Sequence, residues 1–207
     1  MGFEISMNTV QLSAVHEICN IGLGHALTAL STMTGRSFNM EIPKVDAVPA
    51  ATISQMLGGP DEIVVSVLMP FEGDVDGQMA FLFPWESAQQ LWAMLLGAAP
   101  ADYAAVDDMH MSATREVGNI INSSFLNALA DMTGLRMHAT PPSFALDMAI
   151  SVAGSIVVEA EAREAVALAV ETAIFDSEHT TKGYFVLIPT VATLRTMFER
   201  LGIAEAA

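Results

Sequence analysis

"SAVHEICNIG" (residues 13–22) and "SATREVGNII" (residues 112–121) carry one polar pattern twice. In each stretch a serine, a glutamate and an asparagine follow at intervals of four and three residues: Ser13, Glu17 and Asn20, then Ser112, Glu116 and Asn119. At about 100° per residue, these positions share one side of an α-helix. The sequence therefore predicts two helices that present the same polar stripe.

The repetition extends far beyond the two stripes. A shift of 99 positions aligns residues 12–43 with 111–142 without a gap, and 12 of the 32 pairs are identical. Residues 81–97 match 186–202 at a shift of 105, so the second copy is six residues longer in between. Such self-similarity marks an internal duplication. We expect two repeats, about 8–97 and 107–202, and a single domain over 1–207 because no Gly/Ser/Pro-rich linker separates them.

Each copy shows the same order of predicted elements. A long helix begins after Asn8, whose capping-box partner is Gln11, and stops at Gly35; its counterpart runs from about Asp108 to Gly134. Strand-type sequence follows each helix, and a shorter helix closes each copy. The predicted strand segments are 44–52, 62–70 and 77–84 in the first copy and 143–154, 155–162, 165–175 and 183–189 in the second; the closing helices are 85–96 and 190–201.

One half of this size would bury too little core on its own. Two halves that continue one sheet through a pseudo-twofold axis solve this problem. We therefore predict an α+β fold with a pseudo-twofold internal repeat, in which a largely antiparallel sheet of about six strands is covered by two long and two shorter helices.

Composition excludes several classes of function. The formal net charge is -16 and acidic residues outnumber basic ones 24 to 8, which disfavours binding to nucleic acid or to an anionic membrane surface. The single cysteine, Cys19, lies on the apolar side of the first helix and is expected in the core; one cysteine excludes an internal disulfide framework. The chain shows no signal-peptide pattern and no apolar run long enough to span a membrane, so we expect a cytoplasmic protein.

The polar stripe has an ordinary interpretation as a solvated helix face, but its repetition favours a function. No histidine or cysteine is repeated with it as a base or nucleophile. An asparagine amide can donate and accept hydrogen bonds together, which suits it to holding a water in line with a reactive bond that another protein supplies. The glutamate would pair with a cation of that partner, such as a lysine beside its phosphoryl site.

Four positions in each copy carry a family resemblance. Ser-x3-Glu-x2-Asn followed by a proline resembles the signature of the CheC/CheX/FliY phosphatases of bacterial chemotaxis, and both copies carry it whole; the prolines are Pro43 and Pro142. Length and two intact motifs are similar to the CheC type. Cys19 stands where glycine is usual in this family, and His25 where asparagine is usual.

The resemblance implies that the chain hydrolyses the aspartyl phosphate of a CheY-like response regulator. It implies catalytic roles for Glu17, Asn20, Glu116 and Asn119, and supporting roles for Ser13, Pro43, Ser112 and Pro142. Asparagine would orient the attacking water and glutamate would pair with the regulator's lysine. The regulator would supply Mg²⁺, so no intrinsic cofactor or metal is expected, and the deamidase CheD is a further expected partner.

Two other functions stay open at this point. The duplicated helices could bind a receiver domain or CheD as an adaptor without turnover. A small-molecule enzyme is less favoured, because Gly22-x-Gly24 lies within a helix and the five histidines show no repeated ligand spacing.

Overall fold

The two long helices begin and end where the sequence predicts. The computed structural model describes residues 7–175 and 180–203. Helix α1 (Thr9–Thr34) starts with the Asn8–Gln11 capping box and ends at Gly35, which has a φ of 69°. Helix α4 (Asp108–Thr133) is capped by Asp107 and ends at Gly134, with a φ of 70°. Glycine adopts this left-handed conformation without the steric cost that a Cβ brings.

The strands form one continuous sheet in which every pairing is antiparallel. Its order is β1-β6-β7-β3-β2-β4, and β5 also pairs with β2. The bounds are β1 (Asn39–Val48), β2 (Ile63–Gly73), β3 (Gly77–Pro84), β4 (Met137–Ala139), β5 (Ser143–Met148), β6 (Ala167–Phe175) and β7 (Thr180–Pro189).

The two copies exchange their outer strands. β1 of the first copy pairs with β6 of the second, and β5 of the second copy pairs with β2 of the first. The hairpins β2–β3 and β6–β7 meet at the centre, where Ala80 lies opposite Val186 and Phe81 opposite Phe185. Since 80 and 81 correspond to 185 and 186 under the shift of 105, the pairing is symmetric about this point, and the predicted pseudo-twofold repeat is confirmed.

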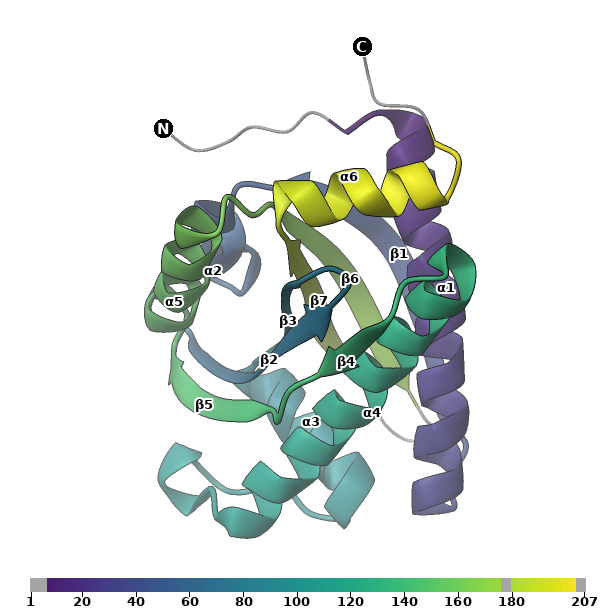
Figure 1. Ribbon diagram of the computed structural model, residues 1–207. Helices are drawn as coiled ribbons and strands as arrows, with labels where there is room; N and C mark the ends of the chain where they lie inside the picture. Colours follow the sequence, from purple (N-terminus) through teal and green to yellow (C-terminus); the bar gives the residue numbers. More distant parts are fainter. Residues whose placement is uncertain (1–6, 176–179, 204–207) are drawn as a thin grey trace.

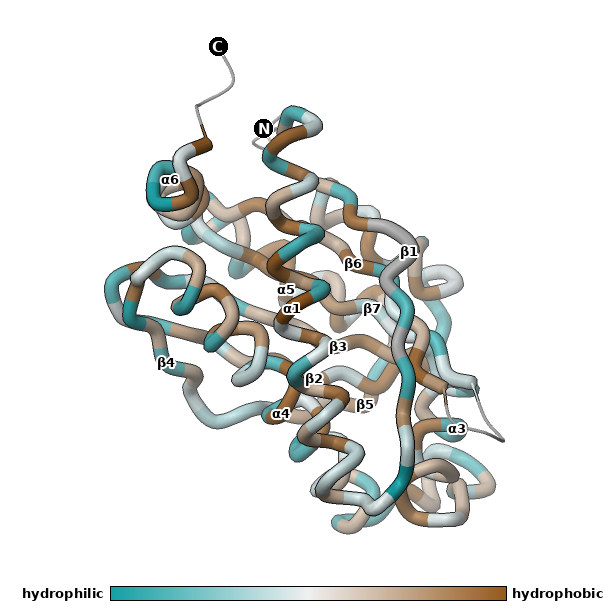
Figure 2. Tube along the Cα trace, turned by 90° about the vertical axis from the view of Figure 1, so that its right-hand side faces the viewer, coloured by the Kyte–Doolittle hydropathy of each residue, from teal (hydrophilic) through white to brown (hydrophobic). Residues whose placement is uncertain are grey.

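Helices cover both faces of the sheet (Figure 1). On one face, α1 and α4 share a core with α3 (Trp85–Leu96) and α6 (Val191–Arg200). On the other, the short α2 (Ile53–Met56), which follows a 3-10 turn at Ala50–Thr52, packs with α5 (Ala149–Ala162). In Figure 2, α1 crosses in front of the sheet and its course alternates between hydrophilic and hydrophobic residues.

Two segments differ from their sequence predictions. The strand predicted over 44–52 ends at Val48, and Ala50–Thr52 form a 3-10 turn instead. Residues 149–162 belong to the predicted strand segments 143–154 and 155–162, but they form α5. The residues that α5 buries are spaced by three and four: Ala149, Val152, Ala153, Ile156 and Ala160. Burial with a helical period therefore overrides β-propensity here. The α+β class is confirmed, with seven strands and six α-helices in the described part of the chain.

Helices α1 and α4 pack directly on one another and run in opposite directions (Figure 1). Their contact is close at Gly22, where an added Cβ would lie 2.7 Å from the Cα of Phe125. Gly118 makes a similar approach to the sheet, since its Cβ would lie 2.7 Å from a methyl carbon of Val67. Both polar stripes precede this crossing, so they extend from it toward opposite ends of the helix pair.

Candidate functional site

The first stripe lies on the solvent side of α1. Ser13, Glu17 and Asn20 are all exposed, whereas Ile18 and Cys19 are completely buried between them. The core thus holds the helix from behind and fixes the direction of the stripe. The prediction that these side chains point outward is confirmed for the first copy.

The second stripe is exposed at Ser112 and Glu116 and half-buried at Asn119. Val117 and Gly118 face the core behind it. Within the described residues the amide of Asn119 forms no hydrogen bond, so both its donor and its acceptor are available.

The two copies differ in what neighbours the asparagine. The Nδ2 of Asn20 lies 3.0 Å from the Nδ1 of His16, one helical turn earlier, and can donate to it. The corresponding residue of the second copy is Arg115, whose guanidinium lies over the ring of Phe144 at 5.8 Å from the ring centroid. The first asparagine therefore has a side-chain partner that the second lacks.

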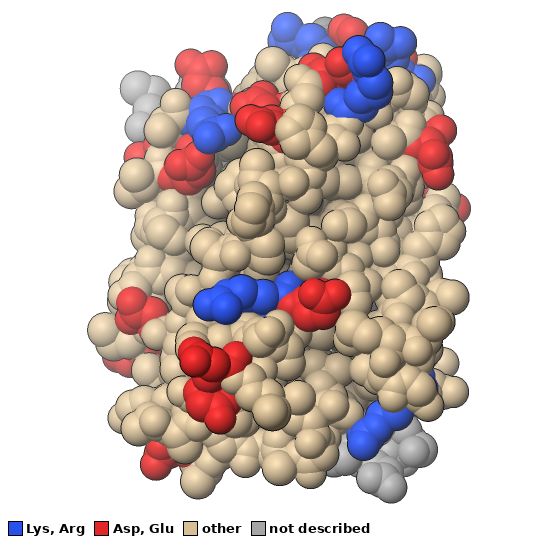
Figure 3. All heavy atoms as spheres, turned by 60° about the horizontal axis from the view of Figure 1, so that its bottom comes forward, with Lys and Arg blue, Asp and Glu red and all other residues tan. Residues whose placement is uncertain are grey.

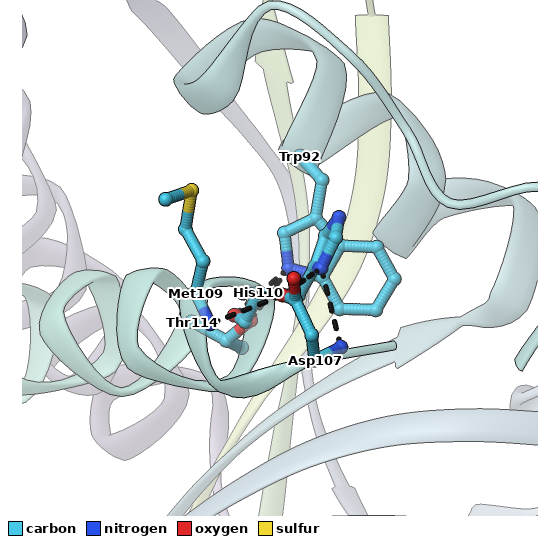
Figure 4. Close-up of polar contacts among 5 residues, drawn as sticks. All are labelled: Trp92, Asp107, Met109, His110 and Thr114. Atoms are coloured by element: carbon cyan, nitrogen blue, oxygen red, sulfur yellow. Dashed lines mark hydrogen bonds and ion pairs between the residues drawn. The ribbon is translucent and has the colours of Figure 1, made fainter. Parts of the chain in front are cut away.

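Figure 4 shows how the beginning of α4 is attached to α3. The indole N–H of the buried Trp92 donates to the Thr114 hydroxyl at 2.8 Å and to the His110 carbonyl at 3.1 Å. Asp107 accepts from the backbone N–H groups of Met109 and His110, and its Oδ1 lies 2.5 Å from the His110 ring. The turns that carry the second stripe are thus held by buried and capping hydrogen bonds.

Hydrogen bonds also set the electrostatics of this helix start. The backbone N–H of His110, followed by its side chain, lowers the pKa of the Asp107 carboxyl. An ionised carboxylate at a helix N-terminus is favourable because the helix dipole is positive there. Asp107 therefore acts as a charged cap, in keeping with a structural role.

The surface beside the stripes is open. A shallow groove next to the second stripe is lined by Leu96, Asp107, Asp108, Met109, Ser112 and Ala113. In the described part of the chain, no three His, Cys, Asp or Glu residues are grouped as metal ligands would be; His179 lies outside that part. None of the described helices has the length and apolar character needed to cross a membrane.

The two motif prolines lie where the regular pairing of the outer strands is interrupted. Pro142 stands between β4 and β5. In β1 the register with β6 shifts between Glu41 and Lys44, the stretch that contains Pro43; the side chain of Pro43 lies outside the described part. Proline lacks the N–H that a regular ladder requires, so it suits such a break in an outer strand. Phe144, two residues after Pro142, is the ring beneath Arg115.

Cys19 is buried, as expected from the sequence, and burial raises the pKa of its thiol to about 12. A thiol in this state is a poor nucleophile at neutral pH. Cys19 therefore belongs to the core of α1 and not to the site.

Sequence reasoning missed three residues that contact the stripes or their helices. His16 precedes Asn20 by four residues, a spacing at which helical side chains meet, so its contact could have been found. The contacts of Trp92 and Phe144 join segments distant in sequence, and spacing alone carries no signal for them.

The sequence of the chain is similar to those of known chemotaxis proteins. The family model described as "Chemotaxis phosphatase CheX" matches residues 65–155, and that of the "CheC-like family" matches residues 10–45. The CheY-P phosphatase CheC of Bacillus subtilis is 32% identical over 196 residues, which cover 93% of this chain and 94% of that protein. The putative CheY-P phosphatase CheC1 of Halobacterium salinarum is 29% identical and covers 64% of this chain and 67% of its own.

Solved structures share the fold. The crystal structure of FliY from Thermotoga maritima matches with a TM-score of 0.76 at 17% identity, covering 96% of this chain and 98% of that one. Because relatedness to CheC extends over nearly the whole length of both proteins, the chain belongs to the CheC-like family of chemotaxis phosphatases.

Proposed function

We propose that this protein hydrolyses the aspartyl phosphate of a CheY-like response regulator. One observation carries the proposal: two helices anchored in the core each carry a Glu–Asn pair at identical spacing. The side chains of these pairs are exposed except for that of Asn119, which is half-buried. Family membership supports the same activity, since the Bacillus subtilis relative bears the name CheY-P phosphatase.

Asn20 and Asn119 would each orient the attacking water. The water oxygen attacks phosphorus, the bond from phosphorus to the aspartyl oxygen breaks, and inorganic phosphate and a free carboxylate result. An acyl phosphate is already labile, so the main requirement is to hold the water in line with the breaking bond. A misplacement of about 1 Å can reduce such a rate by on the order of 10²-fold.

Glu17 and Glu116 would pair with a lysine of the regulator and fix the docked orientation. Each glutamate precedes its asparagine by three residues and is exposed, so both side chains can reach one partner surface. The phosphoryl group and its Mg²⁺ would be held by the regulator's own pocket. This division of labour fits the open surface beside the stripes, since the chain would need no enclosed pocket of its own.

Phosphate release from a phosphorylated CheY-like regulator in the presence of Mg²⁺ tests the proposal. Asn20→Ala and Asn119→Ala should each leave the activity of the other site. The double variant should lose on the order of 10²-fold or more in rate. Asn127→Ala is the matched control, because Asn127 is an exposed asparagine of α4 that lies two turns beyond the stripe. A wild-type rate in the double variant would contradict the mechanism.

Binding without turnover is the outcome that would favour an adaptor. In that case the regulator would bind detectably, yet its phosphate would have the same lifetime with and without the protein. Binding of CheD is a separate expectation that the same purified protein can test.

A further inference from the structure

We propose that Val10 and Met109 are apolar anchors that dock the regulator at the first and the second site. This inference rests on the proposed function and adds to it the contacts that determine affinity. The two residues correspond under the 99-residue shift, and their side chains are 61% and 63% exposed. Among the exposed large hydrophobic residues of the described chain, these two are the only ones that occupy equivalent positions in the two copies.

Both residues lie in line with a polar stripe. Val10 precedes Ser13 by three residues, and Met109 precedes Ser112 by three. Helical residues at positions i, i+3, i+7 and i+10 share one side, so each stripe is a row of four side chains headed by an apolar one. An isolated exposed hydrophobic residue is common on protein surfaces and carries no information. Val10 and Met109, however, occupy equivalent positions, and each stands at the start of the same polar row, so their exposure is not isolated.

The neighbours of these residues have diverged between the copies. Thr9 corresponds to Asp108, and Gln11 corresponds to His110. Capping explains the polar residues of these first turns, since Gln11 and His110 complete the capping boxes. It does not explain an exposed valine or methionine, because acidic residues are the favourable choice in a first helical turn.

A surface that can receive a partner surrounds Met109. The groove beside it is also lined by Ser112 and by Leu96, the last residue of α3, which is 36% exposed. Figure 3 views the molecule from the side of α3 and the beginning of α4, where few charged side chains interrupt a broad uncharged surface. Leu201, the counterpart of Leu96 under the shift of 105, belongs to the second copy and lies just after α6.

The regulator's receiver domain is the occupant because the anchors are continuous with the proposed catalytic pairs. Ten residues separate Met109 from Asn119, which is about 15 Å along a helix. A standard interface buries about 800 Å² on each partner, a patch roughly 30 Å across. A receiver domain that places its phosphorylated aspartate at Asn119 would therefore also cover Met109, and the same holds for Asn20 and Val10.

Steady-state kinetics in single-site variants test the anchors. Val10→Thr is made in the Asn119→Ala protein, where the first site acts alone, and Met109→Gln in the Asn20→Ala protein, where the second site acts alone. Each anchor variant should raise KM for the phosphorylated regulator about tenfold, the loss expected for one well-buried apolar side chain. The kcat should stay within about twofold, because the anchors are distant from the reacting atoms.

Val158→Thr is the matched control, since Val158 is 67% exposed on α5, which packs on the opposite face of the sheet. It should leave KM unchanged. An unchanged KM in both anchor variants, or an equal rise in the control, would overturn the anchors while the phosphatase function stood. If the wild-type protein released no phosphate, the proposed function would fail. Affinity for the beryllofluoride-activated regulator would then decide on the anchors alone: a Kd raised about tenfold supports them, and an unchanged Kd refutes them.

Discussion

Replacing Asn122 with leucine should stabilise the protein. Asn122 lies on the buried side of α4, three residues after Asn119, and is 0% exposed. Neither its Nδ2 nor its Oδ1 has a hydrogen-bond partner in the described structure. The corresponding residue of the first copy is Leu23, which is 1% exposed. The fold thus already accepts leucine at the equivalent place.

The expected gain follows from two opposing terms. A buried amide without partners costs roughly 1–3 kcal/mol in lost hydration, and this cost disappears with leucine. Leucine is larger than asparagine, and overpacking a core typically costs 1–3 kcal/mol. Because Leu23 is accommodated by the symmetry-related packing, we expect the smaller cost. The net result should be a stabilisation of about 1 kcal/mol, or roughly 2–4 °C in Tm for a chain of this size.

Urea unfolding of the wild-type and Asn122→Leu proteins measures this difference, and Leu23→Asn is the reciprocal control. The control should destabilise by at least about 2 kcal/mol, because it buries an amide and removes apolar contact. Phosphate release should be unchanged in Asn122→Leu. A destabilisation of more than about 1 kcal/mol by Asn122→Leu would refute the reasoning, since it would mean that the amide is satisfied in solution, as by an internal water, or that the core does not accommodate leucine at this place.

Three further predictions concern single groups. The buried Cys19 thiol, with its pKa of about 12, should resist a thiol reagent at neutral pH in the native protein and react fully in urea; rapid native labelling would contradict its burial. The backbone N–H of Arg136 lowers the pKa of Asp74, so this carboxyl stabilises the fold above its unfolded pKa and stops doing so as pH falls through the lower folded value. Asp74→Asn should therefore lose less stability than wild type when urea titrations are repeated at successively lower pH from about pH 5 downward. In the Asn119→Ala protein, His16→Leu should lower kcat several-fold, because Asn20 loses its side-chain partner. His16→Gln should keep kcat near that of the Asn119→Ala protein, because glutamine can still accept from Asn20. Equal rates in the two His16 variants would exclude a positioning role.

The local features of the fold were readable from the sequence. Asn8 and Gly35 set the ends of α1 because capping is a short-range interaction, and Gly134 does the same for α4. The outward direction of Glu17 follows from helical period, since Ile18 and Cys19 beside it are apolar. Because the chain is duplicated, each of these predictions for one copy also applies to the equivalent residues of the other copy.

Long-range features could not be read in the same way. Nothing in the pattern of β1 says that its partner is β6 of the other copy, because strand pairing depends on which edges meet in the folded chain. The helical state of α5 depends on burial against the far face of the sheet, which its β-branched composition conceals. The same holds for Trp92, whose hydrogen bond to Thr114 spans 22 residues and fixes the helix that carries the second stripe.

The strand exchange explains how one chain maintains two matching sites. We propose that the two copies form one domain, because the hairpin of each copy is completed by an outer strand of the other and the central pair β3–β7 joins them. In such an arrangement neither stripe can keep its direction unless both copies are folded, since α1 and α4 also pack on each other at Gly22 and Phe125. The two sites would then depend on the same folding free energy, while each site would have its own catalytic rate. The surroundings of Asn20 and Asn119 differ through His16 and Arg115, so the two sites can diverge in rate while the fold that supports them stays common to both.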